Sequence, residues 1–527
     1  MRHHALVGVV VSCLIVSCGA TNAPAEVRLP AVISDNMALQ RDQPIPIWGW
    51  ADAGETVTVT LAGRSVSAKT TSDRRWQVTL PKLGAQSNPL EMMVRGSSGT
   101  SRVVKNVVVG EVWLATGPSN IHWAVRRCDN AKQEIATARH PKIRFFTVGR
   151  KAADGPQADC AGSWIECSPK TVGGVSGVGY FFARRLHKDL GVPVGMLQSF
   201  WGGSRIEAWT SREAIEAEPA LKPILDWWAE HLAKFEPGKI EAGYREKLKR
   251  WQQAAASAKT KGKKPPKKPS PPEDPRTSRH RPACLYNGMI APLIPYGMRG
   301  VISYQGLGNL FWAQYSHVLM PTMIHDWRRR WGQGDFPFGM VQPAPYPCDR
   351  RPKSGPDAYA LLRESQLLLL STVPNTGVAP TMDIGDPSVL HFTNKQDVGR
   401  RMTAWALATV YGRSLAYSGP VYKSMSVEGD RVRIHFSHAD SGLSTKDGNP
   451  PTHFTVAGRD KVFHPAAAAI EGTTVVVKSD TVPHPVAVRF AWSDTSVPNL
   501  FNGDGLPASL FRTDQPTVPY GSSRPGK

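Results

Sequence analysis

Several features that would mark common classes of protein are missing from this sequence. Beyond the first 16 residues, no apolar run approaches the ~20 residues that a membrane-spanning helix needs. The seven cysteines and 15 histidines show no metal-ligand spacing, and no His-Glu-x-x-His motif is present. These absences argue against an integral membrane protein and against a zinc hydrolase.

Acidic residues are in the minority, with 43 Asp and Glu against 64 Lys and Arg and a formal net charge of +21. Such a surplus often indicates a nucleic acid, an anionic lipid or an acidic polymer as partner. About half of it, however, lies between Lys234 and Arg281, where 15 basic residues accompany five acidic ones. Because this stretch contains a Lys- and Pro-rich run without aromatic residues, we expect residues 236–283 to form a solvated insertion. The insertion is either an exposed linker or a tether to an anionic surface, and we expect no nucleic-acid partner.

The N-terminus has the pattern of an export signal. A basic start precedes a short apolar stretch, Ala5–Val16, so residues 1–25 are predicted to be a signal peptide. The segment ending at Cys18 is similar to a bacterial lipobox, whereas Ala23–Ala25 offers an ordinary cleavage site, and both alternatives stay open. We therefore expect a periplasmic or extracellular protein, with any membrane attachment made through a lipid on Cys18.

Five cysteines follow this segment. In an exported protein one or two disulfides are expected, and Cys160 and Cys167 are the nearest pair in sequence. The odd number leaves at least one thiol unpaired within the chain.

The length of 527 residues, at roughly 100–200 residues per domain, predicts three or four folding units. Both ends of the mature chain alternate polar and apolar residues in short runs broken by turn residues, which is typical of β-sandwich-like domains. We predict these domains over 27–105 and 414–515, followed by a flexible tail over 516–527. The predicted strands are Pro44–Trp50, Thr56–Ala62, Trp76–Leu80, Leu90–Val94, Arg431–Phe436, Thr473–Lys478 and Val486–Trp492.

Between these ends, residues 106–235 and 284–413 show apolar strands that run into Gly-rich loops and then amphipathic helices. This order is typical of an α/β domain with a parallel sheet. Helices are predicted over Val178–Leu190 and Asp397–Tyr411, each with apolar residues four apart. The predicted strands are Val107–Ala115, Val194–Phe200, Gly300–Tyr304, Phe338–Val341 and Val378–Ile384.

Ligands of such sheets bind beyond the carboxyl ends of the strands, so the loops there are the first place to look for chemistry. Four loops carry a serine, glycine amides, an asparagine and a histidine, which are the groups that acyl transfer needs as nucleophile, oxyanion donors and base. The loops are Thr116–Asn120, Trp201–Ser204, Gln305–Asn309 and Asp383–His391.

At this point the sequence resembles the sialate O-acetylesterases and related carbohydrate acetylesterases of the SGNH hydrolase class. The resemblance implies an SGNH-hydrolase-like parallel sheet with helices on both faces, flanked by the two β domains. The matching segments are Ser34–Arg41, Trp48–Ala51, Gly110–Leu114, Ser199–Trp209, Leu285–Leu293, Asp326–Pro337 and Asn394–Arg401.

The resemblance also implies an activity: an exported carboxylic ester hydrolase that removes acetyl groups from sialic acid or other sugars without a metal or organic cofactor. Ser119 would be the nucleophile and His391 the base. The Ser119 amide, a Gly202 or Gly203 amide and the Asn309 side chain would hold the oxyanion.

The sequence departs from the family pattern at its acidic positions. His122, Leu307 and Val389 stand where the family has acids, and Pro118 replaces a glutamine without removing the Ser119 N–H. We expect Pro118 to hold the preceding glycine in extended geometry.

The lost acid two residues before His391 leaves Asp383 and Asp386 as candidate partners of the imidazole. If neither reaches it, the site is a Ser–His dyad.

Two functional interpretations follow. One is an active esterase with an altered pocket; the other is a catalytically impaired paralogue that acts as an exported carbohydrate-binding protein. Neither interpretation favours a particular oligomeric state. The expected substrate-binding residues are Asn120, His122, Trp123, Trp201 and Gln305.

Overall fold

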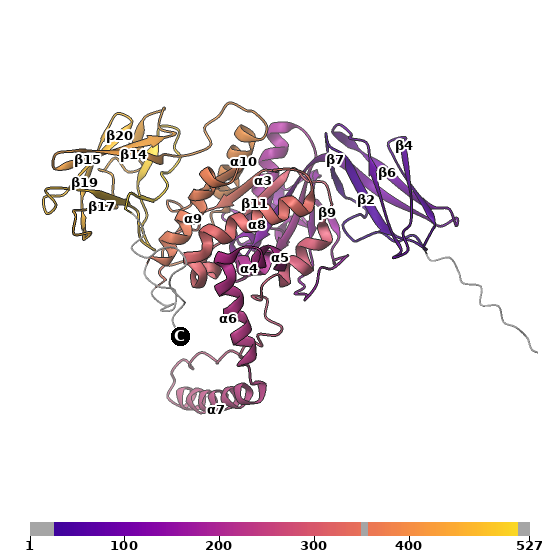
Figure 1. Ribbon diagram of the computed structural model, residues 1–527, viewed down its shortest axis with the longest axis horizontal. Coiled ribbons are helices and arrows are strands. Elements are labelled where there is room, and N and C mark those ends of the chain that lie inside the picture. The colour runs from indigo at the N-terminus through magenta and orange to yellow at the C-terminus, as the bar shows by residue number, and fades with distance from the viewer. Residues whose placement is uncertain (1–25, 349–356, 515–527) are drawn as a thin grey trace, which may run out of the picture.

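The computed structural model describes residues 26–348 and 357–514 (Figure 1). The predicted signal peptide with Cys18 and the predicted tail over 516–527 lie outside these described residues. A β domain lies at each end of the long axis, with an α/β domain between them. Over the described ranges, no helix is long and apolar enough to cross a bilayer.

The central domain is built on a mixed sheet in the order β13-β12-β11-β7-β10-β8-β9. Every neighbouring pair is parallel except β8 and β9. Strands β10 and β12 are buried at every residue, as expected for parallel strands covered on both faces. The strands are β7 (Ser101–Gly117), β8 (His140–Thr147), β9 (Trp164–Cys167), β10 (Val194–Phe200), β11 (Gly300–Ser303), β12 (Phe338–Val341) and β13 (Thr376–Ala379).

Helices cover both faces of this sheet and form two separate cores. One core contains α3 (Gly177–Leu190) and α10 (Lys395–Thr409), which pack against each other. The other contains α8 (Ser316–Trp331) and α9 (Ala358–Thr372). Shorter helices complete the domain: α1 (Ser119–His122), α2 (Ala131–Thr137), α4 (Ile206–Trp209), α5 (Arg212–Glu216) and α6 (Lys222–Ala233).

The fifth predicted strand, Val378–Ile384, is wrong at its carboxyl end. Strand β13 ends at Ala379, because the next residue, Pro380, has no N–H to continue the ladder. Two strands, β8 and β9, were missed because β8 includes Arg144, a charge inside an apolar run. The structure buries Arg144 to 2% exposure and pairs it with Glu166.

Strand β7 belongs to two domains at once. Its first half pairs with β6 (Gln86–Gly96) and β1 (Ala38–Gln40) of the N-terminal domain. Its second half pairs with β10 and β11 of the central sheet. The predicted boundary between residues 105 and 106 therefore falls inside a continuous strand.

The remaining strands of the N-terminal domain form two layers. Two of them extend the β6–β7 sheet and two form a separate antiparallel ribbon. They are β3 (Thr56–Leu61) and β4 (Arg64–Lys69) in the sheet, and β2 (Ile45–Trp50) and β5 (Arg75–Leu80) in the ribbon.

The C-terminal domain has its own apolar core between two four-stranded sheets, β14-β15-β20-β19 and β18-β17-β21-β23, with a small β16–β22 sheet beside them. Its strands are β14 (Val421–Glu428), β15 (Arg431–Ser437), β16 (Leu443–Thr445), β17 (Phe454–Ala457), β18 (Phe463–Pro465), β19 (Ala467–Glu471), β20 (Thr474–Lys478), β21 (Ala487–Phe490), β22 (Leu500–Asn502) and β23 (Phe511–Arg512).

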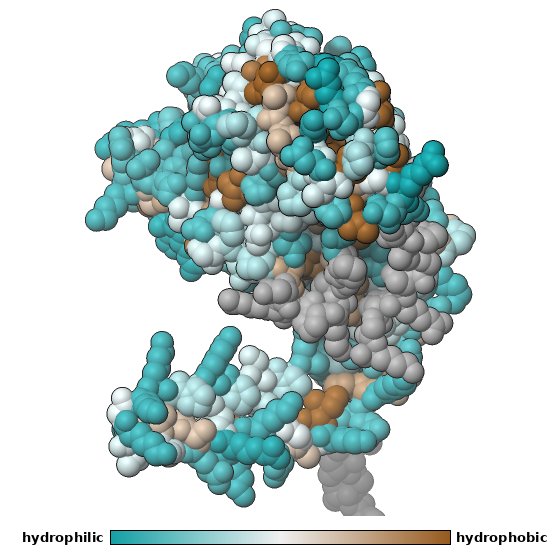
Figure 2. All heavy atoms as spheres, turned by 90° about the vertical axis from the view of Figure 1, so that its left-hand side faces the viewer, coloured by the Kyte–Doolittle hydropathy of each residue, from teal (hydrophilic) through white to brown (hydrophobic). Residues whose placement is uncertain are grey.

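The basic insertion contains a long helix, unlike an extended linker. It contains α7 (Pro237–Thr260), a 24-residue helix without a buried residue, held on an arm away from the body (Figure 1). Its surface is largely hydrophilic in Figure 2. Apolar periodicity could not indicate this helix, because ion pairs four residues apart, such as Glu241–Arg245, support it instead. The insertion then returns to the body, where Ala283 is 2% exposed.

Cys160 and Cys167 are both free thiols, so the disulfide expected between them is not formed. Cys160 packs against the core on one side of the sheet and Cys167 lies in the core on the other side. Burial raises the pKa of both thiols to about 12, which suppresses the reactive thiolate.

The middle of β7 carries a buried carboxylate that joins separate parts of the chain. Glu111 accepts hydrogen bonds from Arg41 at 2.6 Å, Arg299 at 2.9 Å, Gln40 at 3.1 Å and the Tyr411 hydroxyl at 2.9 Å. Burial opposes its ionisation, but Arg299, Arg41 and Gln40 outweigh burial and hold the pKa of Glu111 below its usual range.

We predict that Glu111→Ala destabilises the protein by about 3–5 kcal/mol, because it leaves two arginines without their carboxylate. Thermal unfolding should show a lowered melting temperature. Glu91→Ala on the exposed side of β6 is the matched control and should leave it unchanged. Equal melting temperatures for the two variants would contradict this role of Glu111.

Candidate active site

The loop after β7 makes a sharp turn that only glycine can begin. Gly117 has φ +131°, and a Cβ there would lie 2.5 Å from the carbonyl oxygen of Tyr304. The expectation that Pro118 holds Gly117 in ordinary extended geometry was therefore wrong, because close packing against the loop after β11 dictates the turn. The Trp201 N–H donates to the Gly117 oxygen at 3.1 Å, which joins the loop after β10 to the same turn.

Ser119 and His391, 272 residues apart, meet at this turn. The Oγ of Ser119 lies 2.7 Å from Nε2 of His391, within hydrogen-bond distance. The ring of Trp123 stacks on the imidazole, with centroids 5.0 Å apart and planes inclined by 15°. Trp123 was predicted to bind sugar, but one of its faces supports His391 and its Nε1 donates to the Arg127 oxygen.

Asn120, which was predicted to bind substrate, connects the loop of Ser119 to the loop of His391. Its Nδ2 donates to the oxygen of Leu390, the neighbour of His391, at 3.3 Å. Its Oδ1 accepts a hydrogen bond from Nζ of Lys395 at 2.8 Å. The hydrogen bond from Asn120 to Leu390 therefore joins the immediate neighbours of Ser119 and His391.

Lys395, which the sequence analysis did not single out, is a fully buried cation beside this connection. Its Nζ lies 3.6 Å from the centroid of the Phe392 ring. Burial lowers the pKa of Lys395 to about 7, with Cys128 and Asp129 opposing the shift. The only sequence signal for it was its place within one of the family-like segments.

Neither predicted acid contacts His391. Asp383 is 9% exposed and makes a two-bond ion pair with Arg401 at 2.6 and 2.7 Å. Asp386 accepts hydrogen bonds from the N–H and hydroxyl of Ser388, which lower its pKa. Over residues 26–348 and 357–514, no hydrogen bond to Nδ1 of His391 is found. The described site is therefore a Ser–His dyad.

The two loops that carry the predicted oxyanion donors pack together beside Ser119. A Cβ at Gly202 would lie 3.7 Å from the Cβ of Ser119, so the glycine loop lies directly beside this serine. Gly308 packs on this loop, and Asn309 follows with its Oδ1 accepting from the Ile206 N–H at 3.1 Å. Asn309 is fully buried and its Nδ2 has no hydrogen-bond partner among the described residues, so this donor is free for a ligand.

The Gly202–Gly203 peptide is held by a residue from the basic insertion. Nε of Arg279 donates to the Gly202 oxygen at 3.1 Å, which orients the N–H of Gly203 away from the arginine. Gly203 has φ +76°, a left-handed conformation that favours glycine. No sequence signal distinguished Arg279 from the other basic residues around it.

The other predicted substrate-binding residues divide into two kinds. Gln305 is 1% exposed, and its backbone oxygen accepts a hydrogen bond from Gln366. Its side-chain Oε1 has no hydrogen-bond partner among the described residues, so its contact with substrate stays a prediction. His122 and Trp201 are half-buried, and Arg150 lies beside both. Its Nη2 is 3.2 Å from each ring nitrogen of His122, and its guanidinium carbon is 6.0 Å from the Trp201 ring centroid.

The electrostatic surroundings keep the imidazole neutral. Burial, followed by the charges of Lys395 and Arg127, lowers the pKa of His391. A neutral imidazole at neutral pH can accept the proton of Ser119. In the described ranges, no three His, Cys, Asp or Glu side chains gather as a metal site would require.

No family model matches the chain. A solved carbohydrate acetylesterase from Xanthomonas citri is 34% identical and superimposes with a TM-score of 0.78, covering 93% of this chain and 99% of its own. The chain belongs to the sialate O-acetylesterase family of carbohydrate acetylesterases. The sialate O-acetylesterases of Homo sapiens and Rattus norvegicus are 28% and 29% identical, over 93% and 79% of both chains.

Membership makes this protein a carboxylic ester hydrolase, and it gives the described contacts a chemical context. In this esterase, His391 and the Gly202–Gly203 loop lie beside Ser119, and Gly308, the neighbour of Asn309, packs on that loop. Among the described residues, neither Asp383 nor Asp386 hydrogen-bonds to His391.

We predict that Lys395→Met moves the acid limb of the kcat/KM–pH profile to higher pH. In the esterase, activity falls as pH drops through the lowered pKa of His391, because a protonated imidazole cannot act as base. Removing the cation raises that pKa, so the loss of activity begins at higher pH. Lys142→Met, at an exposed position on β8, should leave the limb in place. If the acid limb of Lys395→Met stays at the pH of the parent enzyme, Lys395 does not lower the pKa of His391.

We also predict that Val389→Asp raises kcat at least tenfold. Residue 389 stands in the tight turn before His391, where the Val389 N–H donates to the Asp386 oxygen, and its side chain is 42% exposed. A carboxylate beside Nδ1 selects the productive tautomer and stabilises the imidazolium, an effect worth on the order of 10⁴ in other triads. Val389→Asn tests size and polarity without charge. If kcat is the same in both variants, residue 389 does not reach the imidazole.

Proposed function

We propose that this protein is a serine acetylesterase that removes O-acetyl groups from carbohydrates by an acyl-enzyme mechanism on an SGNH-type sheet. The contact of 2.7 Å between Ser119 and His391 is the observation that carries the proposal. The unpartnered amide of Asn309 supports it, because a fully buried donor without a partner is a cost that a bound oxyanion would remove.

In the first half-reaction, Oγ of Ser119 attacks the acetyl carbonyl carbon while Nε2 of His391 takes the hydroxyl proton. The carbonyl oxygen becomes an oxyanion, which the N–H groups of Ser119 and of Gly202 or Gly203 and the Nδ2 of Asn309 stabilise. The bond to the sugar oxygen then breaks, and His391 returns the proton to that oxygen. The products are the free sugar hydroxyl and an acetylated Ser119.

In the second half-reaction, water replaces the sugar. The oxygen of the water attacks the acetyl carbon while His391 takes one of the protons of the water. The N–H donors of the first half-reaction then hold the second oxyanion. The ester bond to Oγ breaks, the proton passes to Ser119, and acetate leaves.

The dyad works without a carboxylate because other contacts hold the imidazole. Trp123 fixes its plane by stacking, and the Asn120–Leu390 hydrogen bond fixes the backbone beside it. These contacts restrain position but do not stabilise positive charge, and Lys395 and Arg127 oppose that charge. We therefore propose a slower enzyme than one with a full triad.

The substrate class follows from the relatives. Two relatives are named sialate O-acetylesterase and the solved one is a carbohydrate acetylesterase, which together support an acetylated sugar, either sialic acid or another glycan, as substrate. Export through residues 1–25, with or without a lipid on Cys18, belongs to the same proposal, because acetylated glycans occur outside the cell.

One observation favours a second candidate, a catalytically impaired carbohydrate-binding protein: the missing carboxylate partner of His391. Such a protein would retain sugar binding but release no acetate.

Acetate release from a panel of acetylated mono- and polysaccharides distinguishes the two candidates. We predict release by the parent protein and a loss of at least 10³-fold in Ser119→Ala and in His391→Ala, because each change removes one half of the dyad. A serine-directed phosphonate should label the parent and not Ser119→Ala. Thermal unfolding of all three proteins serves as the folding control. Folded parent protein without release or labelling would instead support the binding protein.

A further inference from the structure

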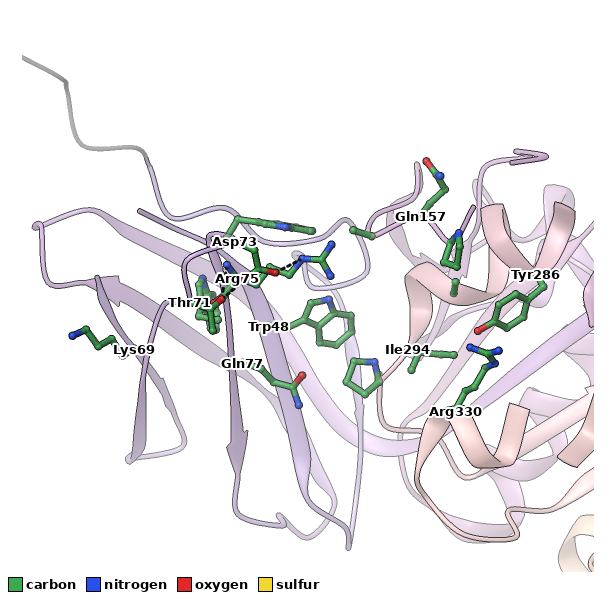
Figure 3. A pocket seen from close by; sticks show the side chains of 17 residues that line it. Trp48, Lys69, Thr71, Asp73, Arg75, Gln77, Gln157, Tyr286, Ile294 and Arg330 are labelled. Carbon is green, nitrogen blue, oxygen red and sulfur yellow. Dashed lines mark hydrogen bonds and ion pairs between the residues drawn. The ribbon is translucent and has the colours of Figure 1, made fainter. Parts of the chain in front are cut away.

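A pocket of about 740 Å³ lies between the N-terminal β domain and the central domain (Figure 3). Neither Ser119 nor His391 lines it. One wall comes from β2 and β5, and the other from the loop after β8, from the turn at Tyr286 and from α8. Its volume is in the range of pockets that bind small organic ligands.

The alternation of the β2–β5 ribbon explains the chemistry of the first wall. Successive residues of a strand point to opposite faces, and the register pairs Trp48 with Gln77 and Trp50 with Arg75 on one face. The opposite face enters the core through residues such as Ile47 and Trp76, which are 0% and 3% exposed. The outward face of such a ribbon is usually polar. Here it carries two tryptophan rings, each beside the polar side chain of its partner, Gln77 or Arg75.

The two tryptophans on that face differ in availability. The guanidinium of Arg28 lies 3.9 Å from the centroid of the Trp50 ring and covers it. Trp48 is half-buried and meets Tyr296 edge to face, with centroids 6.4 Å apart. In Figure 3, Trp48 lies at the centre of the pocket between Arg75 and Gln77. An edge-to-face contact leaves a ring face of Trp48 for a ligand.

Two of the three cations that line the pocket, Arg75 and Arg330, already have carboxylate partners, and the third, Lys69, is exposed. Arg75 lies 3.5 Å from Asp73 on the ribbon. Across the pocket, Arg330 lies 2.7 Å from Asp326 and over the ring of Tyr286. Because these guanidiniums have carboxylate partners, the pocket suits an uncharged ligand with many hydroxyls better than an anion. A pyranose ring has this character, with an apolar C–H face that stacks on an indole and hydroxyls that pair with Arg and Gln side chains.

One loop connects this pocket to the catalytic site. Arg150 contacts His122 beside the dyad, and Gln157 of the same loop lines the pocket. The loop is held at the Tyr286 turn, where the Gln157 N–H donates to the Asn287 oxygen at 2.9 Å. Seven residues span at most about 25 Å, so a chain of several sugar units could follow the loop from one site to the other.

We propose that this pocket is a glycan-binding subsite that holds a neutral stretch of the polysaccharide whose acetyl group is removed at Ser119. The ring of Trp48 stacks on one pyranose, and Arg75 and Gln77 hydrogen-bond its hydroxyls. The link to catalysis rests on the proposed esterase function, whereas binding in the pocket does not require turnover.

Calorimetric titration of the full-length Ser119→Ala protein with unacetylated oligosaccharides separates binding from turnover. The probes are cellohexaose, xylohexaose and mannohexaose as neutral chains, and a galacturonic acid hexamer as an acidic chain. We expect at least one neutral probe to bind, and its Kd to rise tenfold or more when Trp48→Ala is added. Trp251→Ala on α7 is the matched control, because it removes a tryptophan outside the pocket.

Arg75→Ala, at a side chain 62% exposed, gives a second variant that carries little risk of misfolding, and it should also weaken binding. Unchanged affinity in both pocket variants, or binding of none of the neutral probes, would overturn the subsite. Exclusive binding of the acidic hexamer would overturn its neutral character. Absence of acetate release by the parent protein, with neutral binding intact, would count against the proposed function and leave the subsite standing.

Discussion

The structure depends on one strand that two domains share. The hydrogen bonds of β7 start in the N-terminal sheet, run past Glu111 and end at Gly117, two residues before Ser119. Parallel neighbours on both sides hold its end, since β10 pairs up to Gly117 and β11 up to Thr116. Ser119 is therefore positioned by a ladder that runs through the N-terminal and central domains. The buried carboxylate at its centre adds ionic links to Arg41 in the N-terminal domain and to Arg299 in the loop before β11.

Around Ser119, packing and hydrogen bonds perform the positioning that a carboxylate provides in a triad. Trp123 sets the plane of the imidazole, and Asn120 joins the two loops while Lys395 holds its oxygen. Burial of the charged Lys395 ammonium is unfavourable in free energy, and this penalty lowers its pKa. The cation also disfavours protonation of the His391 imidazole. The arrangement therefore favours the neutral form of the His391 imidazole over its protonated form.

Sequence patterns located the regular parts of the fold well. Continuous apolar runs indicated β10 and β12, and four-residue apolar spacing indicated α3 and α10, because both patterns reflect local geometry and burial. The patterns missed α7, whose helix depends on surface ion pairs, and they suggested a disulfide between Cys160 and Cys167. Nearness in sequence could not show that a sheet separates these two thiols.

By itself, the sequence determined which chemistry was available: a serine, a histidine and an asparagine in loops after strands, in segments typical of one esterase family. Only the tertiary structure decided how these groups are used. It directed Asp383 to Arg401, Asn120 to Lys395 and Trp123 to His391, and it brought Arg279 from the basic insertion to the glycine loop. Polar side chains form their bonds with whatever group packing places within about 3 Å, and sequence spacing does not contain that distance.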